Sequence, residues 1–253
     1  MRRPGRLFAW LTAAMLLGWG LSWALGPTRG AWGVAPRTLA EVNWFRVRAV
    51  RVEGLRNLSA EEVERVAAVP AQANLWDDPE PVAARVRAHA LVREVSVVRR
   101  LPATLVVRVS EREPVALMPT PTLEPVDREG HRLPLDPARL RLDLPVLRPG
   151  GSSAAARAPA AIAPAAREIA RLAEADPSFW ANVSVVSAEG SRDVTLDLSE
   201  PAVRVRVRIP LTPLRLREAR AVLDDATGRT GEPPAIIDLR FADQVVVRRG
   251  EPN

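Results

Sequence analysis

An uncharged apolar stretch near the N-terminus constrains this chain most. Residues 7–25 read LFAWLTAAMLLGWGLSWAL and contain no acidic or basic side chain. As an α-helix this stretch extends about 28 Å, close to the ~30 Å hydrocarbon core of a bilayer. Arg2, Arg3 and Arg6 precede it, and such a basic flank stays in the cytoplasm. The sequence therefore predicts a cytoplasmic stub over 1–6, a transmembrane helix over 7–26 and an extracytoplasmic remainder.

A cleaved signal peptide is the alternative interpretation of this segment. Signal peptides have a shorter apolar region of about 7–15 residues, followed by an A-x-A-like cleavage site. Here the apolar stretch is longer, and the residues that follow it, Ala24-Leu25-Gly26-Pro27, match that site poorly. The Arg2–Arg3 pair also lacks the residues that surround it in a twin-arginine signal. We therefore favour a permanent membrane anchor.

The high pI of 11.2 does not by itself indicate that the chain binds nucleic acid. The 253 residues include 36 basic and 30 acidic ones, and every basic residue is arginine, which does not titrate in the accessible range. No basic block with interleaved aromatic residues is present, so nucleic-acid binding is not predicted. The absence of cysteine excludes disulfides, thiol catalysis and cysteine-ligated metals.

The sequence contains no recognisable catalytic or metal-binding constellation. The two histidines, His89 and His131, stand in a predicted helix and a predicted turn, without H-x-x-H or H-E-x-x-H spacing. Neither a G-x-S-x-G nor an S-x-x-K motif occurs. We therefore predict a protein that is not an enzyme and needs no cofactor, metal or small-molecule substrate.

After a Pro/Gly/Trp-containing linker over 27–44, residues 45–113 show a compact strand–helix–helix–strand–strand pattern. The first strand is predicted over 46–52 and ends at Gly54. Ser59 and Glu62 form a capping box before the first helix, and Asp78-Pro79 is expected to begin the second. Val95 and Val97, then Leu105, Val107 and Val109, mark two strands joined by a hairpin at 101–103. Such a unit is stable when both helices cover one face of a three-stranded sheet.

Residues 114–249 are predicted to form a second α+β domain with a mainly antiparallel sheet, followed by a tail over 250–253. Residues 148–164, rich in Ala, Gly and Ser, are expected to be a flexible insertion. Arg204, Arg206 and Arg208 alternate with apolar residues, and we interpret their face as solvated; anionic lipid or an acidic partner are the alternatives. The predicted elements are helices over 165–175 and 214–223 and strands over 182–186, 193–198, 203–209, 235–241 and 244–248.

Three segments carry a resemblance to a known family. The run Val50-Arg51-Val52-Glu53-Gly54, the helix pair and the hairpin over 95–109 together resemble a POTRA domain. The segment Glu111-Arg112-Glu113-Pro114-Val115-Ala116, leading into Val126-Asp127-Arg128-Glu129-Gly130, resembles the FtsQ/DivIB family of bacterial cell-division proteins. The last strands, from Ile237 to Arg248, are similar to those of the same family.

The resemblance implies a non-enzymatic scaffold of the division septum in the cytoplasmic membrane. Such proteins bind the bitopic partners FtsB (DivIC in other bacteria) and FtsL and help to regulate septal peptidoglycan synthesis. The family's partner adds a β-strand to an exposed sheet edge. Mapped onto this sequence, the contact falls on Arg240, Phe241, Gln244, Val245, Val246 and Val247.

Alternatives remain open for the site and for the function. Asp238 and Arg240 can instead satisfy a turn, with Phe241 in the core. A POTRA-containing component of outer-membrane assembly or secretion is a second functional hypothesis, although such proteins usually repeat the POTRA unit or append a β-barrel. A membrane-anchored periplasmic binding protein or hydrolase is a third.

Overall fold

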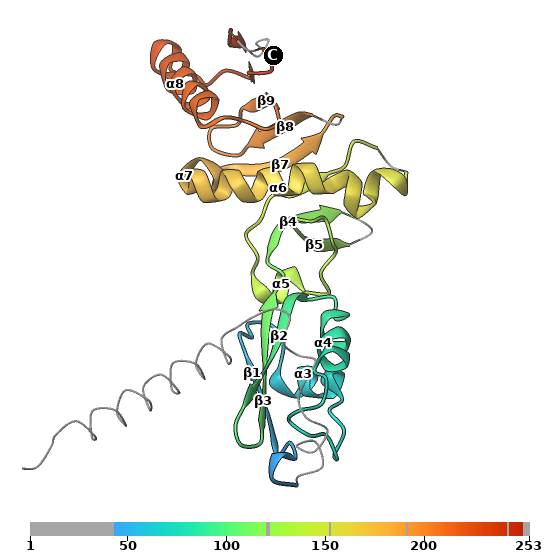
Figure 1. Cartoon of the computed structure of the whole chain (residues 1–253). Coiled ribbons are helices and arrows are strands. Elements are labelled where there is room, and N and C mark those ends of the chain that lie inside the picture. The colour runs from blue at the N-terminus through green and yellow to red at the C-terminus, as the bar shows by residue number, and fades with distance from the viewer. Residues whose placement is uncertain (1–42, 120–121, 152, 191, 242, 250–253) are drawn as a thin grey trace, which may run out of the picture.

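Two β-sheets organise the chain (Figure 1). The computed structural model describes residues 43–119, 122–151, 153–190, 192–241 and 243–249. The predicted stub, transmembrane helix, most of the linker and the tail over 250–253 lie outside these ranges. Within the described residues, no helix combines the length and the apolar character needed to cross a bilayer.

The N-terminal unit contains a three-stranded sheet of order β1-β3-β2 with two helices on one side (Figure 1). Strand β1 runs parallel to β3, whereas β2 and β3 form the predicted antiparallel hairpin, in which Arg100 faces Thr104. The predicted order of elements is confirmed. Those elements are η1 (Asn43–Phe45), β1 (Ala49–Glu53), α3 (Ala60–Ala67), α4 (Glu80–Arg87), β2 (Val92–Arg100) and β3 (Thr104–Glu111).

Capping residues set where the two helices of this unit begin. The Ser59 hydroxyl accepts a hydrogen bond of 3.1 Å from the Glu62 amide, as the capping box predicts. Helix α4 begins at Glu80, later than predicted, because Pro79 itself occupies the N-cap position. The Asp78 carboxylate nevertheless accepts from the Glu80 amide at 3.0 Å. Gly54 ends β1 with a positive φ of 88°, a conformation that glycine adopts without strain.

The C-terminal unit contains a mixed eight-stranded sheet of order β11-β10-β9-β8-β7-β6-β4-β5. Four of its seven strand pairs are antiparallel and three are parallel, so the predicted antiparallel character holds only by a small majority. The strands are β4 (Pro114–Pro119), β5 (Leu123–Asp127), β6 (Val146–Arg148), β7 (Val183–Ala188), β8 (Asp193–Leu198), β9 (Arg204–Arg208), β10 (Ile236–Asp238) and β11 (Val246–Arg248).

Helices α6 (Pro159–Ala175), α7 (Pro177–Trp180) and α8 (Pro213–Thr230) supply side chains to the core of this sheet. Short helices α5 (Pro137–Leu140) and η2 (Ala155–Arg157) lie in connections. The prediction of a flexible insertion over 148–164 is wrong for 159–164, which form the first turns of α6. Ile162 is buried there against the sheet, and Pro159 occupies the first turn, where its missing N–H is not needed.

Strand β9 confirms the predicted alternation. Val205 and Val207 are buried in the core. On the other face, Arg204 pairs with Asp197 at 2.8 Å and Arg208 pairs with Asp193 at 2.9 Å, both across the β8–β9 ladder. The Arg204 and Arg208 side chains remain about half exposed, and carboxylates of the neighbouring strand offset their charge. Arg206, between them, is half-buried, so the prediction of a solvated face holds for two of its three arginines.

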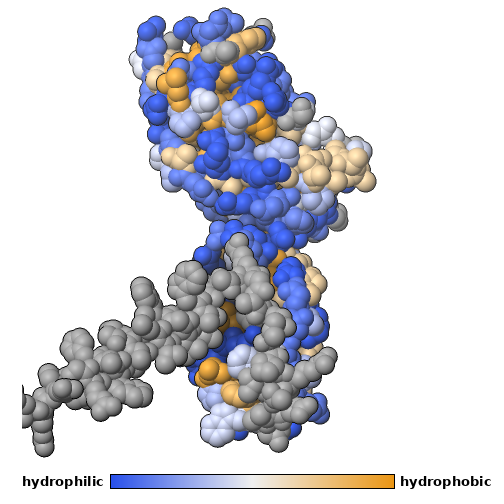
Figure 2. All heavy atoms as spheres, in the orientation of Figure 1, coloured by the Kyte–Doolittle hydropathy of each residue, from blue (hydrophilic) through white to orange (hydrophobic). Residues whose placement is uncertain are grey.

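The two units meet at a junction whose surface is mostly hydrophilic in the view of Figure 2. They are joined there by more than the chain connection between β3 and β4. Leu133, which follows β5, is only 3% exposed and belongs to the core of the N-terminal unit, where Leu135 also packs. The chain thus leaves the N-terminal unit, forms the first hairpin of the second sheet and returns to complete the first core. The predicted strand–turn over 126–131 is present at this point, with Gly130 at φ +82°.

Candidate partner-binding edge

Strand β11 forms one edge of the eight-stranded sheet and lies near the C-terminal end of the chain (Figure 1). Among the described residues, its only strand neighbour is β10, with which it pairs antiparallel so that Val247 faces Ile237. One side of β11 therefore has backbone groups that no strand of this part of the chain satisfies.

The apolar side chains at this edge are partly accessible. Phe241 is 45% exposed and Val247 is 40% exposed, whereas Val245 packs partly against the core. Gln244 is exposed and Val246 is half-buried. The alternative that Phe241 belongs to the core is therefore wrong. A large exposed aromatic side chain in the connection that leads to an edge strand is suited to anchor another polypeptide.

Arg240 is already paired within its own turn. Its guanidinium donates to the Asp238 carboxylate at 2.7 Å, and its Nη1 lies 3.8 Å from Asp193 on β8. The hydrogen bond from Arg240, outweighing burial, holds the pKa of Asp238 below its ordinary value. Arg240 thus has the intramolecular role that the alternative interpretation assigned to it. Only the guanidinium N–H groups of Arg240 that do not donate to Asp238 are available to bind a partner.

Arg215 of α8 holds the connection between β10 and β11, a role that sequence reasoning missed. Its guanidinium donates to the backbone carbonyl oxygens of Phe241 and of Gln244, the latter at 3.1 Å, and approaches that of Leu239 at 3.4 Å. The side chain is 15% exposed. No local pattern distinguishes this arginine from the others of α8, because its function depends on which loop the fold brings beside it.

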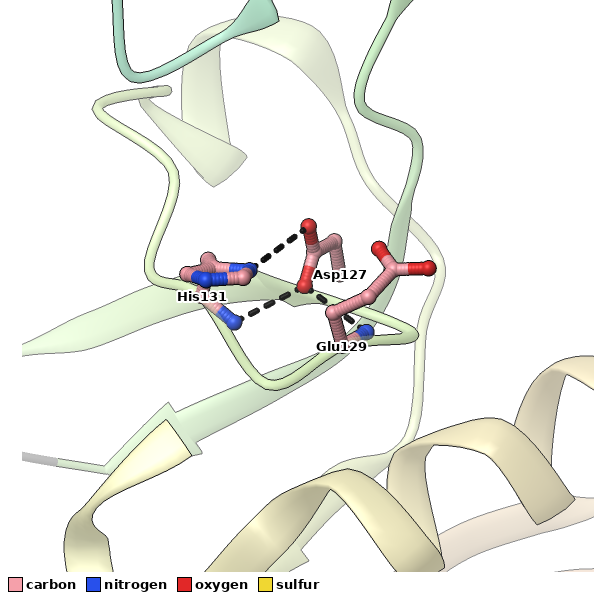
Figure 3. A group of neighbouring side chains, drawn as sticks. All are labelled: Asp127, Glu129 and His131. Atoms are coloured by element: carbon pink, nitrogen blue, oxygen red, sulfur yellow. Dashed lines mark hydrogen bonds and ion pairs between the residues drawn. The ribbon is translucent and has the colours of Figure 1, made fainter. Parts of the chain in front are cut away.

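A second polar cluster lies where the two units meet. Asp127, Glu129 and His131 each place one ligand-type atom within 4.8 Å of the others (Figure 3). Asp127 is 1% exposed and accepts hydrogen bonds from the backbone amides of Glu129 and His131. These acceptor atoms resemble a metal site, but a guanidinium already lies among them.

Arg112, the residue after β3, supplies that guanidinium. Its Nη1 lies 2.6 Å from Asp127, 3.4 Å from Glu129 and 3.1 Å from the ring of His131. Burial alone would raise the pKa of Asp127, but the hydrogen bonds from Arg112 and the His131 amide outweigh it and lower that pKa. We interpret the cluster as an internal ion-pair network that fixes the β5 turn to the end of the N-terminal unit.

Glu111, the neighbour of Arg112, fixes the other side of this junction. Its carboxylate is buried and accepts from the backbone amides of Arg56, Asn57 and Leu58 at 2.7–3.1 Å. Burial raises its pKa, but these hydrogen bonds outweigh that effect and hold the pKa below its ordinary value. The segment Glu111-Arg112 therefore has a structural role: the Glu111 side chain accepts hydrogen bonds from the loop over 56–58, and the Arg112 side chain pairs with the turn that follows β5.

Comparisons with known proteins agree with this architecture. Residues 45–112 match the family model described as "POTRA domain, FtsQ-type", and residues 116–240 match "Cell division protein FtsQ/DivIB, C-terminal". A protein named cell division protein FtsQ from Rhodothermus marinus is 32% identical over 85% of this chain and 84% of its own length. The protein of the same name from Anaeromyxobacter sp. is 28% identical over the whole of this chain and 89% of its own. The chain belongs to the FtsQ/DivIB family of bacterial cell division proteins.

Proposed function

We propose that the protein is a non-enzymatic scaffold of the division complex that binds FtsB- and FtsL-type bitopic proteins through the β11 edge. A strand of the partner pairs with the free side of β11, and Phe241 packs against the partner's apolar side chains. Through this contact the protein couples assembly of the complex to septal peptidoglycan synthesis.

The observation that carries this proposal is the position of β11 at the end of the sheet. An open strand edge with exposed apolar residues is an aggregation hazard unless a partner covers it. The edge offers backbone hydrogen bonds for affinity and an aromatic side chain for specificity. Arg215 supports the proposal further, because it holds the connection before β11 in one conformation and so reduces the ordering cost of binding.

Membrane anchoring is part of the same proposal. The uncharged stretch over 7–25 is long enough to span a bilayer, and the arginines before it favour a cytoplasmic N-terminus. Both sheets would then lie outside the cytoplasmic membrane, at the septum. A fluorescent fusion that remains evenly distributed around dividing cells would contradict the septal location.

Co-purification of the full chain with co-expressed FtsB- and FtsL-type proteins of the same organism tests the edge directly. Phe241→Lys places a charge beside the proposed contact, and we expect it to abolish co-purification. Leu123→Lys is the matched control, because Leu123 is also 45% exposed but lies on β5, at the opposite edge of the same sheet. Equal binding by both variants would refute the proposal.

Proline substitutions test the backbone contribution. In an antiparallel pair, neighbouring residues alternately direct their N–H groups toward the partner strand and away from it. Of Val246→Pro and Val247→Pro, one therefore removes an internal N–H and the other removes an outward one. We expect the outward substitution to weaken partner binding while amide exchange in β10 stays unchanged. Normal binding by both variants would exclude strand addition at β11.

A further inference from the structure

We propose that a hollow between the two units binds a compact, multiply charged anion carrying phosphate groups. The hollow, named here the junction hollow, has a volume of about 530 Å³. Six of its ten lining residues carry a guanidinium or imidazole group, and none is acidic. The lining consists of Arg87, Ala88, His89, Ala90, Val92, Arg112, His131, Arg132, Arg157 and Pro159.

The basic side chains come from segments that are distant in the sequence. Arg87 ends α4, and His89 follows it. Arg112 follows β3, His131 and Arg132 follow the β5 turn, and Arg157 ends η2. A basic hollow assembled from both units is therefore a product of the tertiary fold and not of one arginine-rich segment.

Most of these groups have an acidic neighbour outside the lining, and this limits what they offer to a ligand. Arg87 pairs with Glu80 and Arg132 pairs with Glu124, both at 2.9 Å and both through Nη1. His89 lies 3.4 Å from Glu62. A guanidinium has five N–H donors, so an ion pair through one nitrogen leaves other donors available.

Arg157 contributes most to the anion-binding capacity, and Arg112 adds donors, although two carboxylates offset its charge. No described residue forms an ion pair or a side-chain hydrogen bond with Arg157, which is half-buried at the end of η2. The contacts that the Arg112 side chain makes with Asp127, Glu129 and His131 all involve Nη1. The network therefore fixes the position of the Arg112 guanidinium and leaves its other nitrogens for a ligand.

The arrangement favours a phosphate-bearing ligand. Guanidinium groups bind phosphate and carboxylate oxygens bidentately, and several of them around one volume suit a ligand with more than one negative charge. The basic groups surround a single hollow, which fits a compact anion better than an extended acidic peptide. A bound anion would contact both units and so strengthen their association. The phosphate groups can belong to a lipid headgroup or to a soluble phosphate compound.

Calorimetric titration of the full chain in nonionic detergent with inorganic pyrophosphate tests this site. Arg157→Gln should weaken binding about tenfold, the value of one charge-assisted hydrogen bond. Arg167→Gln is the matched control, because Arg167 is an exposed arginine of α6 that does not line the hollow. Equal thermal midpoints of both variants would show that the fold is intact. No pyrophosphate binding, or equal weakening in both variants, would overturn the proposal.

Two competition arms identify the source of the phosphate. Displacement of pyrophosphate by short-chain phosphatidylglycerol would support the site and assign it to a lipid headgroup. Undisturbed pyrophosphate binding would support the site and assign it to a soluble phosphate compound. Binding of hexaglutamate by a chain that does not bind pyrophosphate would refute the anion proposal in favour of an acidic peptide. None of these results depends on Phe241, so the edge proposal stands or fails separately.

Discussion

Removing the guanidinium of Arg215 should loosen the β11 edge without changing its exposed surface. The substitution Arg215→Met keeps an apolar stem of similar length. It removes the donors to the Phe241 and Gln244 carbonyl oxygens, together with an ion pair to the partly exposed Glu218 on the same helix. A hydrogen bond from a charged group contributes about 1.5–3 kcal/mol. The freed carbonyls lie near the surface and regain hydrogen bonds with water, so we expect a net cost of about 1–2 kcal/mol.

This cost should appear as local opening, because the segment after Leu239, the last buried core residue before β11, contributes little to the core. Within it, Val245 packs only partly against the hydrophobic cluster. A change of 1–2 kcal/mol corresponds to roughly 5- to 30-fold faster amide exchange. Native-state hydrogen exchange of the full chain should therefore show this acceleration in β10 and β11, with unchanged rates in the β2–β3 hairpin. Binding of a co-expressed partner should weaken by a similar factor.

Arg217→Met provides the control on the same helix. Arg217 is exposed, so its substitution removes the same charge from α8 without freeing the carbonyls of the β10–β11 connection. Equal exchange rates in the two variants would show that the Arg215 contacts do not hold the edge, and the structural reasoning would be wrong.

Three further predictions concern stability, and thermal or denaturant unfolding measures each of them. Gly130→Ala should destabilise by at least about 1 kcal/mol, because its φ is +82° and an added Cβ would collide with the backbone oxygen of Pro159; an unchanged midpoint would contradict this. Glu111→Gln should destabilise at neutral pH. The pKa of Glu111 is lower in the folded than in the unfolded chain, so ionised Glu111 stabilises the fold above its unfolded pKa of about 4.3, and this stability is lost as the pH falls through the folded pKa. The difference in stability between Glu111→Gln and the parent chain should therefore shrink in acid. A difference that does not change with pH would argue against this. Leu75→Ala should cost about 2–5 kcal/mol, because Leu75 is fully buried, and a smaller cost would mean that the cavity collapses.

The sequence predicted the elements whose signals are local. The Ser59 cap, the hairpin before Thr104 and the alternation around Val205 each depend on neighbouring residues, and all are present in the structure. Their physical causes act over a few positions: a side chain satisfies a nearby amide, or the pleat alternates faces.

The errors arose where distant contacts decide the structure. The alanine-rich composition of residues 159–164 predicts a flexible segment, yet Ile162 packs in the core of the C-terminal unit and the segment is helical. Arg240 forms an ion pair with Asp238, as the alternative interpretation of a turn predicts, and its contact with a partner stays a prediction. The role of Arg215 depends on the approach of a loop about 26 residues away. The exposure of Phe241 agrees with the predicted edge, but its contact with a partner stays a prediction.

The burial of Leu133 affects how the protein can be divided for experiments. The matching family models meet between residues 112 and 116, which suggests a convenient place to cut. A fragment ending there would lack a side chain that its hydrophobic interior requires, and the void left behind would weaken packing. Fragments or chimaeras of the N-terminal unit should therefore retain the segment through residue 135, which carries Leu133 and Leu135 back to this core, or replace these side chains with others that fill the same volume.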